Sequence, residues 1–138
     1  MKRIITIAVF AFTSILAVNK ALAQAPGVEV NVPFNFTAND KVLPAGAYTI
    51  TLESPGVIDI RNRKQHISIT SIVLLDSGQS ENGGELVFTK YGNRYFLHEM
   101  LCDYASMNVH LPTGRSEKWA RTQEAMVQNG SQILLAAK

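Results

Sequence analysis

The chain of 138 residues is predicted to form one small all-β domain, an antiparallel barrel or sandwich with a C-terminal helix, preceded by a signal-peptide helix. Three observations predict this fold class. Apolar and polar residues alternate with period two along several stretches, turn residues separate these stretches, and only one later segment has the spacing and caps of a helix. A chain of this length has room for a single hydrophobic core.

The first strand of the domain is predicted over residues 28–36. Its apolar positions alternate strictly with polar ones, and they are Val28, Val30, Val32, Phe34 and Phe36. This alternation is typical of a strand with one buried face. Pro33 cannot donate a hydrogen bond to a neighbouring strand, so the strand is expected at a sheet edge or at a bulge. Residues 43–46 then fit a type I turn, with Pro44 at its second position.

Three further stretches are predicted as strands. The alternation continues over residues 48–53 and 58–61, on either side of a Ser-Pro-Gly break at 54–56. Residues 66–75 alternate at first and end in a continuous apolar run at 72–75. A continuous run of this kind predicts a central strand that is covered on both faces.

A β-hairpin is the clearest local prediction. Residues 86–91 and 94–102 flank Gly92 and Asn93, a two-residue connection whose residue types tolerate positive φ angles. With these two residues as the loop, the expected cross-strand pairs are Tyr91 with Arg94, Phe88 with Leu97 and Leu86 with Glu99. Both faces of the hairpin are substantially apolar, so we expect it to lie centrally, with other elements packed on each side.

The C-terminal part is predicted to contain one helix, over about residues 116–128. Ser116 is expected to act as its N-cap, and Asn129 and Gly130 to end it. Because the apolar face is narrow, the helix is expected to dock on the sheet rather than to stand alone. That face comprises Trp119, Ala120, Gln123, Met126 and Val127. Before the helix, a short strand is predicted at 107–111, and the apolar tail at 133–137 has no assigned state.

Residues 1–23 have the pattern of a secretory signal peptide. Lys2 and Arg3 precede an uncharged apolar run at 4–18, and the small residues Ala21 and Ala23 predict cleavage between Ala23 and Gln24. The run is shorter than the roughly 18 residues that span a bilayer, and an uncleaved anchor is the alternative. The residue directly after the cleavage point is Gln24 and not the Cys of a lipoprotein signal, and no other stretch is apolar enough to cross a membrane. We therefore expect a periplasmic or extracellular protein with one domain over residues 24–138.

The net charge of the exported domain disfavours nucleic acid as a partner. The whole chain carries +2, from 13 basic and 11 acidic residues. The first 23 residues contain three of the basic residues and none of the acidic ones, which leaves ten against 11, or −1. A basic footprint for nucleic acid is therefore absent from the mature sequence. The single Cys excludes an internal disulfide.

His98, Met100 and Cys102 are the candidate metal ligands of the sequence. They occupy alternate positions of one predicted strand, and imidazole, thioether and thiolate are donors that suit copper. Three such positions spread over roughly 13 Å, so one ion would need a bent strand. The alternative is an ordinary hairpin face with a buried free thiol.

Two groups of surface residues are candidates for ligand binding. Tyr91, Asn93 and Arg94 gather at the hairpin tip, where an aromatic ring beside polar groups suits a sugar or a peptide, although core packing explains them as well. Arg61 and Arg63 form a small basic loop that suits phosphate or an anionic polymer, with a solvated turn as the alternative.

No catalytic residue set and no cofactor site is predicted. The chain has no G-x-S-x-G motif and no glycine-rich phosphate loop. Glu99 is expected among apolar neighbours, where an ion pair with Lys90 or with a basic residue elsewhere, a position at the solvent margin and an acid–base role are the alternatives. We therefore do not expect an enzyme.

Several segments resemble a group of small secreted bacterial proteins of unknown function. They are residues 32–36 (VPFNF), 43–50 (LPAGAYTI), 86–88 (LVF) and 91–97 (YGNRYFL) with Glu99. The likeness covers roughly residues 30–120 and implies export and a compact β fold, but no activity or site residue. Separately, the segment 43–50 is similar to turn-and-strand segments of immunoglobulin-like and carboxypeptidase-regulatory-like sandwiches.

These features predict an exported, non-catalytic envelope or extracellular module. We expect it to bind an unknown partner or ligand through a sheet edge, the hairpin tip or its loops. The alternative function is copper handling through His98, Met100 and Cys102.

Overall fold

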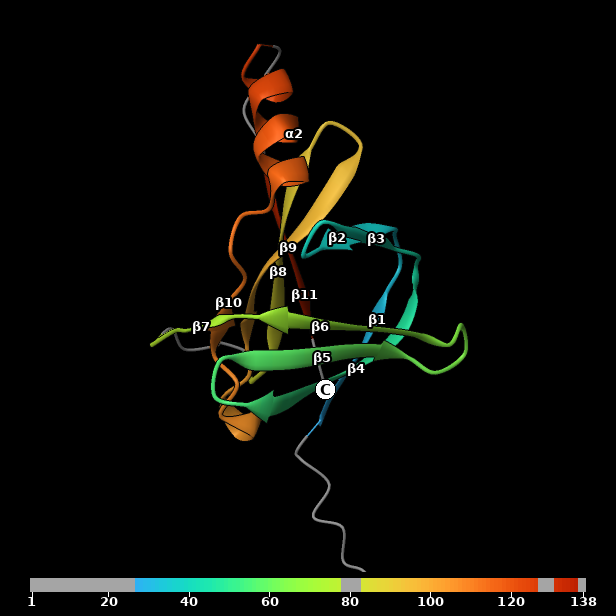
Figure 1. The fold of residues 1–138 in the computed structure, drawn as a ribbon, viewed down its shortest axis with the longest axis vertical. Helices are drawn as coiled ribbons and strands as arrows, with labels where there is room; N and C mark the ends of the chain where they lie inside the picture. Colours follow the sequence, from blue (N-terminus) through green and yellow to red (C-terminus); the bar gives the residue numbers. More distant parts are fainter. Residues whose placement is uncertain (1–26, 78–82, 127–130, 137–138) are drawn as a thin grey trace, which may run out of the picture.

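The computed structural model describes residues 27–77, 83–126 and 131–136 and shows a domain built mostly of antiparallel strands, with one α-helix (Figure 1). The predicted all-β class with a C-terminal helix is therefore confirmed. The predicted signal segment and its cleavage point between Ala23 and Gln24 lie outside the described residues. Within them, no helix is long and apolar enough to cross a membrane.

Four antiparallel strands form the first sheet, in the order β1–β4–β5–β6. They are β1 (Gly27–Val32), β4 (Gly46–Ser54), β5 (Val57–Asn62) and β6 (Ile67–Ile72). β1 lies at an edge, as Pro33 predicted, and its valines are buried while the residues between them are exposed. The predicted strand is too long, because it ends at Val32 and Phe36 begins a separate strand, β2 (Phe36–Ala38). Pro33 follows the end of β1 because it lacks the N–H that a ladder needs.

The second sheet has the order β11–β8–β9–β10–β7. Its strands are β7 (Leu74–Leu75), β8 (Glu85–Tyr91), β9 (Arg94–Leu101), β10 (Val109–His110) and β11 (Ser131–Ala136). A short hairpin of β2 and β3 (Lys41–Leu43) joins this sheet, because β2 runs parallel to β9 where Thr37 pairs with Phe96. Figure 1 shows β8 and β9 running across the direction of β4, β5 and β6.

One hydrophobic core lies between the two sheets. Tyr48 and Ile60 of the first sheet and Phe88 and Met100 of the second are almost completely buried in it. Phe36 joins the two sides, since its ring makes edge-to-face contacts with both Tyr48 and Phe88. The chain passes between the sheets before β2, before β4 and before β7. The domain therefore has two sheets around one core, linked by three crossing segments.

The continuous apolar run at 72–75 does not form a covered central strand, so that prediction is wrong. β6 ends the first sheet and β7 ends the second. Ile72, Leu74 and Leu75 are 73%, 62% and 65% exposed, and only Val73 between them is buried. A continuous apolar run is typical of a buried strand, but it does not by itself determine which neighbours the strand has.

The hairpin of β8 and β9 is central, as predicted, with β11 on one side and β10 on the other. Tyr91 pairs with Arg94 and Phe88 with Leu97, which confirms the predicted register near the turn. The predicted pair of Leu86 with Glu99 is wrong, because Leu86 pairs with Met100 and Val87 with Glu99. β9 thus has one extra residue, His98, opposite the step from Val87 to Phe88. This irregularity is a β-bulge.

The helix α2 (Arg115–Ala125) begins after Gly114, and its cap comes from a distant part of the chain. Asp40, in the turn between β2 and β3, accepts hydrogen bonds from the backbone N–H groups of Arg115 and Ser116, at 3.0 and 2.9 Å. The Ser116 hydroxyl donates to the same carboxylate. The predicted N-cap role of Ser116 is therefore wrong, and Ser116 lies within the first turn.

The buried face of α2 also differs from the prediction. Trp119 and Met126 are 64% and 83% exposed, whereas Glu117 and Ala120 are the buried residues of the helix. Val127 and the predicted stop at 129–130 lie outside the described residues. The helix therefore docks with a small and partly polar face.

We predict that Asp40→Ala lowers the free energy of unfolding by about 1 kcal/mol, the usual effect of removing an N-cap side chain. The hydrogen bonds from Ser116 and Arg115 lower the pKa of Asp40 below its ordinary value of 3.8. Its contribution is thus fully present above 3.8 and is lost as the pH falls below 3.8 through the lowered pKa of the folded protein. Denaturant unfolding of both proteins between pH 7 and pH 2 measures this difference.

The control for this experiment is Glu29→Ala, at an exposed position of β1. It should change the unfolding free energy by less than about 0.5 kcal/mol. Equal stability of Asp40→Ala and the wild type at neutral pH would show that the cap does not hold the helix.

Candidate metal centre

The bulge in β9 turns two consecutive side chains to the same face of the second sheet. Leu97 and Met100 are both buried in the core, and His98 and Glu99 lie between them. Since adjacent residues of a regular strand point to opposite faces, only the extra residue allows both flanking side chains to face inward. His98 and Glu99 therefore lie together on the outer face, where both are half-buried.

β10 brings a second histidine to this face. Val109 pairs with Met100 on the core side, and the next residue, His110, pairs with Glu99 on the outer side. The backbone N–H of Leu111 donates to the carbonyl of His98 at 2.8 Å, which holds β10 beside the bulge. The rings of His98 and His110 meet edge to face, with their centroids 4.3 Å apart.

His98, Glu99 and His110 form one cluster of potential metal ligands. Each offers one ligand atom, and these three atoms all lie within 4.8 Å of one another. Nδ1 of His110 is 3.6 Å from Oε1 of Glu99. Two imidazoles and a carboxylate are donors that suit Zn²⁺ and other divalent transition metals.

The surroundings of His98 favour the form of imidazole that binds metal. Burial lowers the pKa of His98 below its ordinary value of 6.5, the positive charge of His110 lowers it further, and Glu99 opposes this change. A neutral imidazole has a free lone pair for a metal ion. In addition, Nδ1 of His98 is buried and has no hydrogen-bond partner among the described residues. Leaving a buried polar atom unpaired costs about 1–3 kcal/mol, so a bound metal ion at this atom would be stabilising.

The structure does not bring the three predicted copper ligands together. Met100 and Cys102 are fully buried in the hydrophobic core, whereas His98 lies on the outer face with His110. The bulge is the reason, because it breaks the alternation that would have aligned them. The thiol of Cys102 is 4.0 Å from the carbonyl oxygen of Gly83.

The residues of the hairpin tip lie against α2. Arg94 donates a hydrogen bond from Nη2 to Oε1 of Gln123 at 3.0 Å, and Tyr91 contacts the edge of Phe96. Asn93 is exposed at the turn. A shallow groove of about 380 Å³ runs between the tip and the helix. Arg94 thus contributes to helix docking, and Tyr91 packs on Phe96 of β9.

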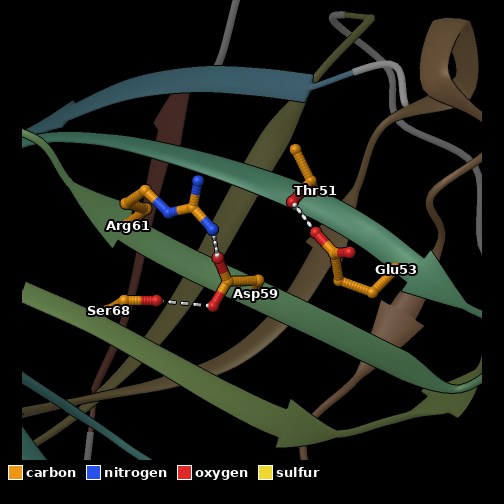
Figure 2. A network of polar contacts seen from close by, with 5 residues as sticks. All are labelled: Thr51, Glu53, Asp59, Arg61 and Ser68. Atoms are coloured by element: carbon orange, nitrogen blue, oxygen red, sulfur yellow. Dashed lines mark hydrogen bonds and ion pairs between the residues drawn. The ribbon is translucent and has the colours of Figure 1, made fainter. Parts of the chain in front are cut away.

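The two arginines of the basic loop have different surroundings. Arg61 forms an ion pair with the buried carboxylate of Asp59 at 2.7 Å, and Ser68 donates to the same carboxylate at 2.8 Å (Figure 2). Arg63 is exposed and lines a groove of about 570 Å³ together with Lys64 and residues of β1 and β4. Arg61 is therefore part of the sheet surface, and Arg63 is the free member of the pair.

Sequence reasoning missed His110 as a site residue. The short strand predicted at 107–111 contains it, but nothing in the sequence assigned β9 as the partner of that strand. The available signal was the presence of only three histidines in the chain, all of them on predicted strands. The candidate partners of Glu99 were Lys90 or a basic residue elsewhere, and the structure places His110 beside it, with Nδ1 3.6 Å from Oε1.

Comparisons with protein-family models, with curated proteins and with solved structures found no match for this chain. The case for the candidate metal centre therefore comes from the geometry and chemistry of its residues.

We predict that Cys102 in the folded protein reacts with a thiol reagent at least about 100-fold more slowly than in the denatured protein, since labelling requires local opening of the core. Its side chain is completely buried. The reference is Thr70→Cys in a Cys102→Ser background, which places a thiol at an exposed position of β6. Equal rates for these two thiols would show that Cys102 is accessible and open to a role in metal binding.

Proposed function

We propose that this domain is an exported, non-catalytic binding module that holds one divalent transition-metal ion, of the Zn²⁺ type, at His98, Glu99 and His110. The observation that carries the proposal is the convergence of these three ligand atoms within 4.8 Å. The orphaned Nδ1 of His98 points to the same conclusion, because a metal ion would supply its missing partner.

The spacing of the cluster favours a shared ion over a simple hydrogen bond. The 3.6 Å between His110 and Glu99 is longer than a hydrogen bond between nitrogen and oxygen. Two ligands on one tetrahedral Zn²⁺, each bound at about 2.0–2.2 Å, lie about 3.4 Å apart. The His110–Glu99 spacing is close to this value, and the remaining separations, at most 4.8 Å, would have to shorten by up to about 1.4 Å for all three residues to share an ion.

The placement of the ligands on paired strands supports binding. His110 and Glu99 are cross-strand partners in the ladder of β9 and β10, so their relative position is set by backbone hydrogen bonds. The two larger grooves described above are lined by other residues. A reaction usually needs a concave pocket beside its ligands or bases, so a binding role suits the cluster better than catalysis.

The export part of the proposal rests on the sequence. The segment of residues 1–23 has the pattern of a cleaved signal, and the segments at 43–50 and 91–97 resemble small secreted bacterial proteins. We accordingly place the metal-binding module in the periplasm or outside the cell.

Nitrogen and oxygen donors suit the site better than the sulfur donors of the copper alternative. Met100 and Cys102 face the core, so neither sulfur atom shares the outer face with His98. Copper(I) prefers such soft ligands, whereas imidazole and carboxylate suit divalent ions.

We predict that the tag-free protein binds one Zn²⁺ per chain and that His98→Ala and His110→Ala each weaken this binding at least tenfold. Even changes outside the first coordination shell commonly cost about 10–100-fold in affinity. Isothermal titration with a competing chelator measures the dissociation constants. Zn²⁺ at about 100 times the dissociation constant should also stabilise the wild type by about 2.7 kcal/mol.

His66→Ala provides the matched control, since His66 is the third histidine and is exposed between β5 and β6. It should bind Zn²⁺ like the wild type, as should Cys102→Ser. Absence of stoichiometric Zn²⁺ binding by the wild type, or equal losses for all three histidine variants, would contradict the proposed function.

A further inference from the structure

Glu117 is a buried carboxylate that points from the helix toward the candidate metal centre. It lies in the first turn of α2 and is only 5% exposed. Its Oε1 is 4.0 Å from Nδ1 of His98, the buried nitrogen without a hydrogen-bond partner. A polar atom on the helix and one on the sheet thus face each other at a distance too long for a hydrogen bond.

In the part of the chain that the structure describes, no lysine or arginine lies within ion-pair distance of this carboxylate. Among the residues that the structure describes, His98 is the only basic group within ion-pair distance of Glu117. Arg121, one turn further along α2, acts on it only from beyond that distance. Burial raises the pKa of Glu117 above its ordinary value of 4.5, with Arg121 and His110 opposing. A buried carboxylate without a partner is costly, and a nearby metal ion would compensate its charge.

The position of Glu117 over the cluster is fixed from two directions. Asp40 holds the backbone of Arg115 and Ser116, so the residue that follows them has little freedom to turn away. Further along the helix, Gln123 is tied to Arg94 at the hairpin tip. α2 therefore presents Glu117 to β9 and β10 without depending on Glu117 itself.

We propose that Glu117 is the fourth ligand of the metal centre and that the bound ion joins α2 to β9 and β10. This inference rests on the proposed function. Two imidazoles and two carboxylates complete a tetrahedral coordination shell, and their two negative charges balance a divalent ion. Oε1 of Glu117 is 4.0 Å from Nδ1 of His98, and Glu117 lies outside the group of three ligand atoms that are within 4.8 Å of one another. Two ligands of a tetrahedral ion lie about 3.4 Å apart, so a side-chain movement of about 0.6 Å would bring this pair to the required spacing.

Because the apolar face of α2 is small, metal coordination by Glu117 is expected to affect how firmly the helix is held on the sheet. Ala120 is the only buried apolar residue of the helix, and Trp119 is largely exposed. Apolar burial therefore contributes little to holding α2 on the sheet, and the helix is expected to open locally at low free-energy cost. A metal ion held from both sides would suppress this opening.

The test compares Glu117→Gln with the wild type and uses Glu124→Gln as the matched control on the same helix. Zn²⁺ affinity is measured by chelator competition, and hydrogen exchange of the α2 amides is followed with and without saturating Zn²⁺. We expect Glu117→Gln to bind Zn²⁺ at least tenfold more weakly. In the wild type and in Glu124→Gln, Zn²⁺ should slow hydrogen exchange of the α2 amides at least tenfold. In Glu117→Gln, Zn²⁺ should slow this exchange much less.

The visible spectrum of bound Co²⁺ adds a readout that a purely structural role of Glu117 would not change. At saturating metal, its d–d bands should differ between Glu117→Gln and the wild type, because one ligand is exchanged. Unchanged affinity, spectrum and exchange in Glu117→Gln would overturn the role of Glu117 while leaving the three-ligand site intact. Absence of Zn²⁺ binding by the wild type would overturn the proposed function, and this inference with it.

Discussion

One extra residue in β9 determines which side chains form the core and which form the candidate metal centre. Without the bulge, strict alternation would bury Glu99 beside Leu97 and would turn Met100 and Cys102 outward. A buried unpaired carboxylate costs several kcal/mol, whereas a lost ladder hydrogen bond costs about 1 kcal/mol. The bulge at His98 therefore costs less free energy than a regular strand with Glu99 buried in the core. The bulge keeps the side chains of Met100 and Cys102 in the core. It puts His98 and Glu99 on the outer face of the sheet, the same face as His110 of the neighbouring strand β10.

The helix α2 is held on the second sheet mainly by polar contacts and only to a small extent by apolar packing. Asp40 caps its first turn from the hairpin of β2 and β3, and Arg94 holds Gln123 from the tip of β8 and β9. Between these two attachments lies Glu117, buried against His98 with no lysine or arginine of the described residues within ion-pair distance. A protein selected for stability alone would avoid a buried carboxylate of this kind. Such local violations are typical of functional sites, where the missing stabilisation comes from a ligand.

The sequence predicted the fold class, the central hairpin and its register near the turn, because alternation and turn residues are local features. It could not predict the bulge, since nothing in residues 94–102 marks His98 as the extra residue until the core is assembled. For the same reason His98 was grouped with Met100 and Cys102, and His110 was overlooked. The exposed Ile72, Leu74 and Leu75 and the distant cap at Asp40 depend on which segments meet in space. Local sequence patterns do not determine which distant segments come into contact in the folded protein.

X-ray absorption spectroscopy of the Zn²⁺-loaded protein identifies the atoms bound to the metal and therefore tests the assignment of the metal centre. We predict a first shell made only of nitrogen and oxygen at about 2.0–2.2 Å, with the outer-shell scattering of two imidazole rings. A sulfur atom at about 2.3 Å would instead place the ion at Cys102. That result would contradict both the outward position of the centre and the role assigned to the bulge.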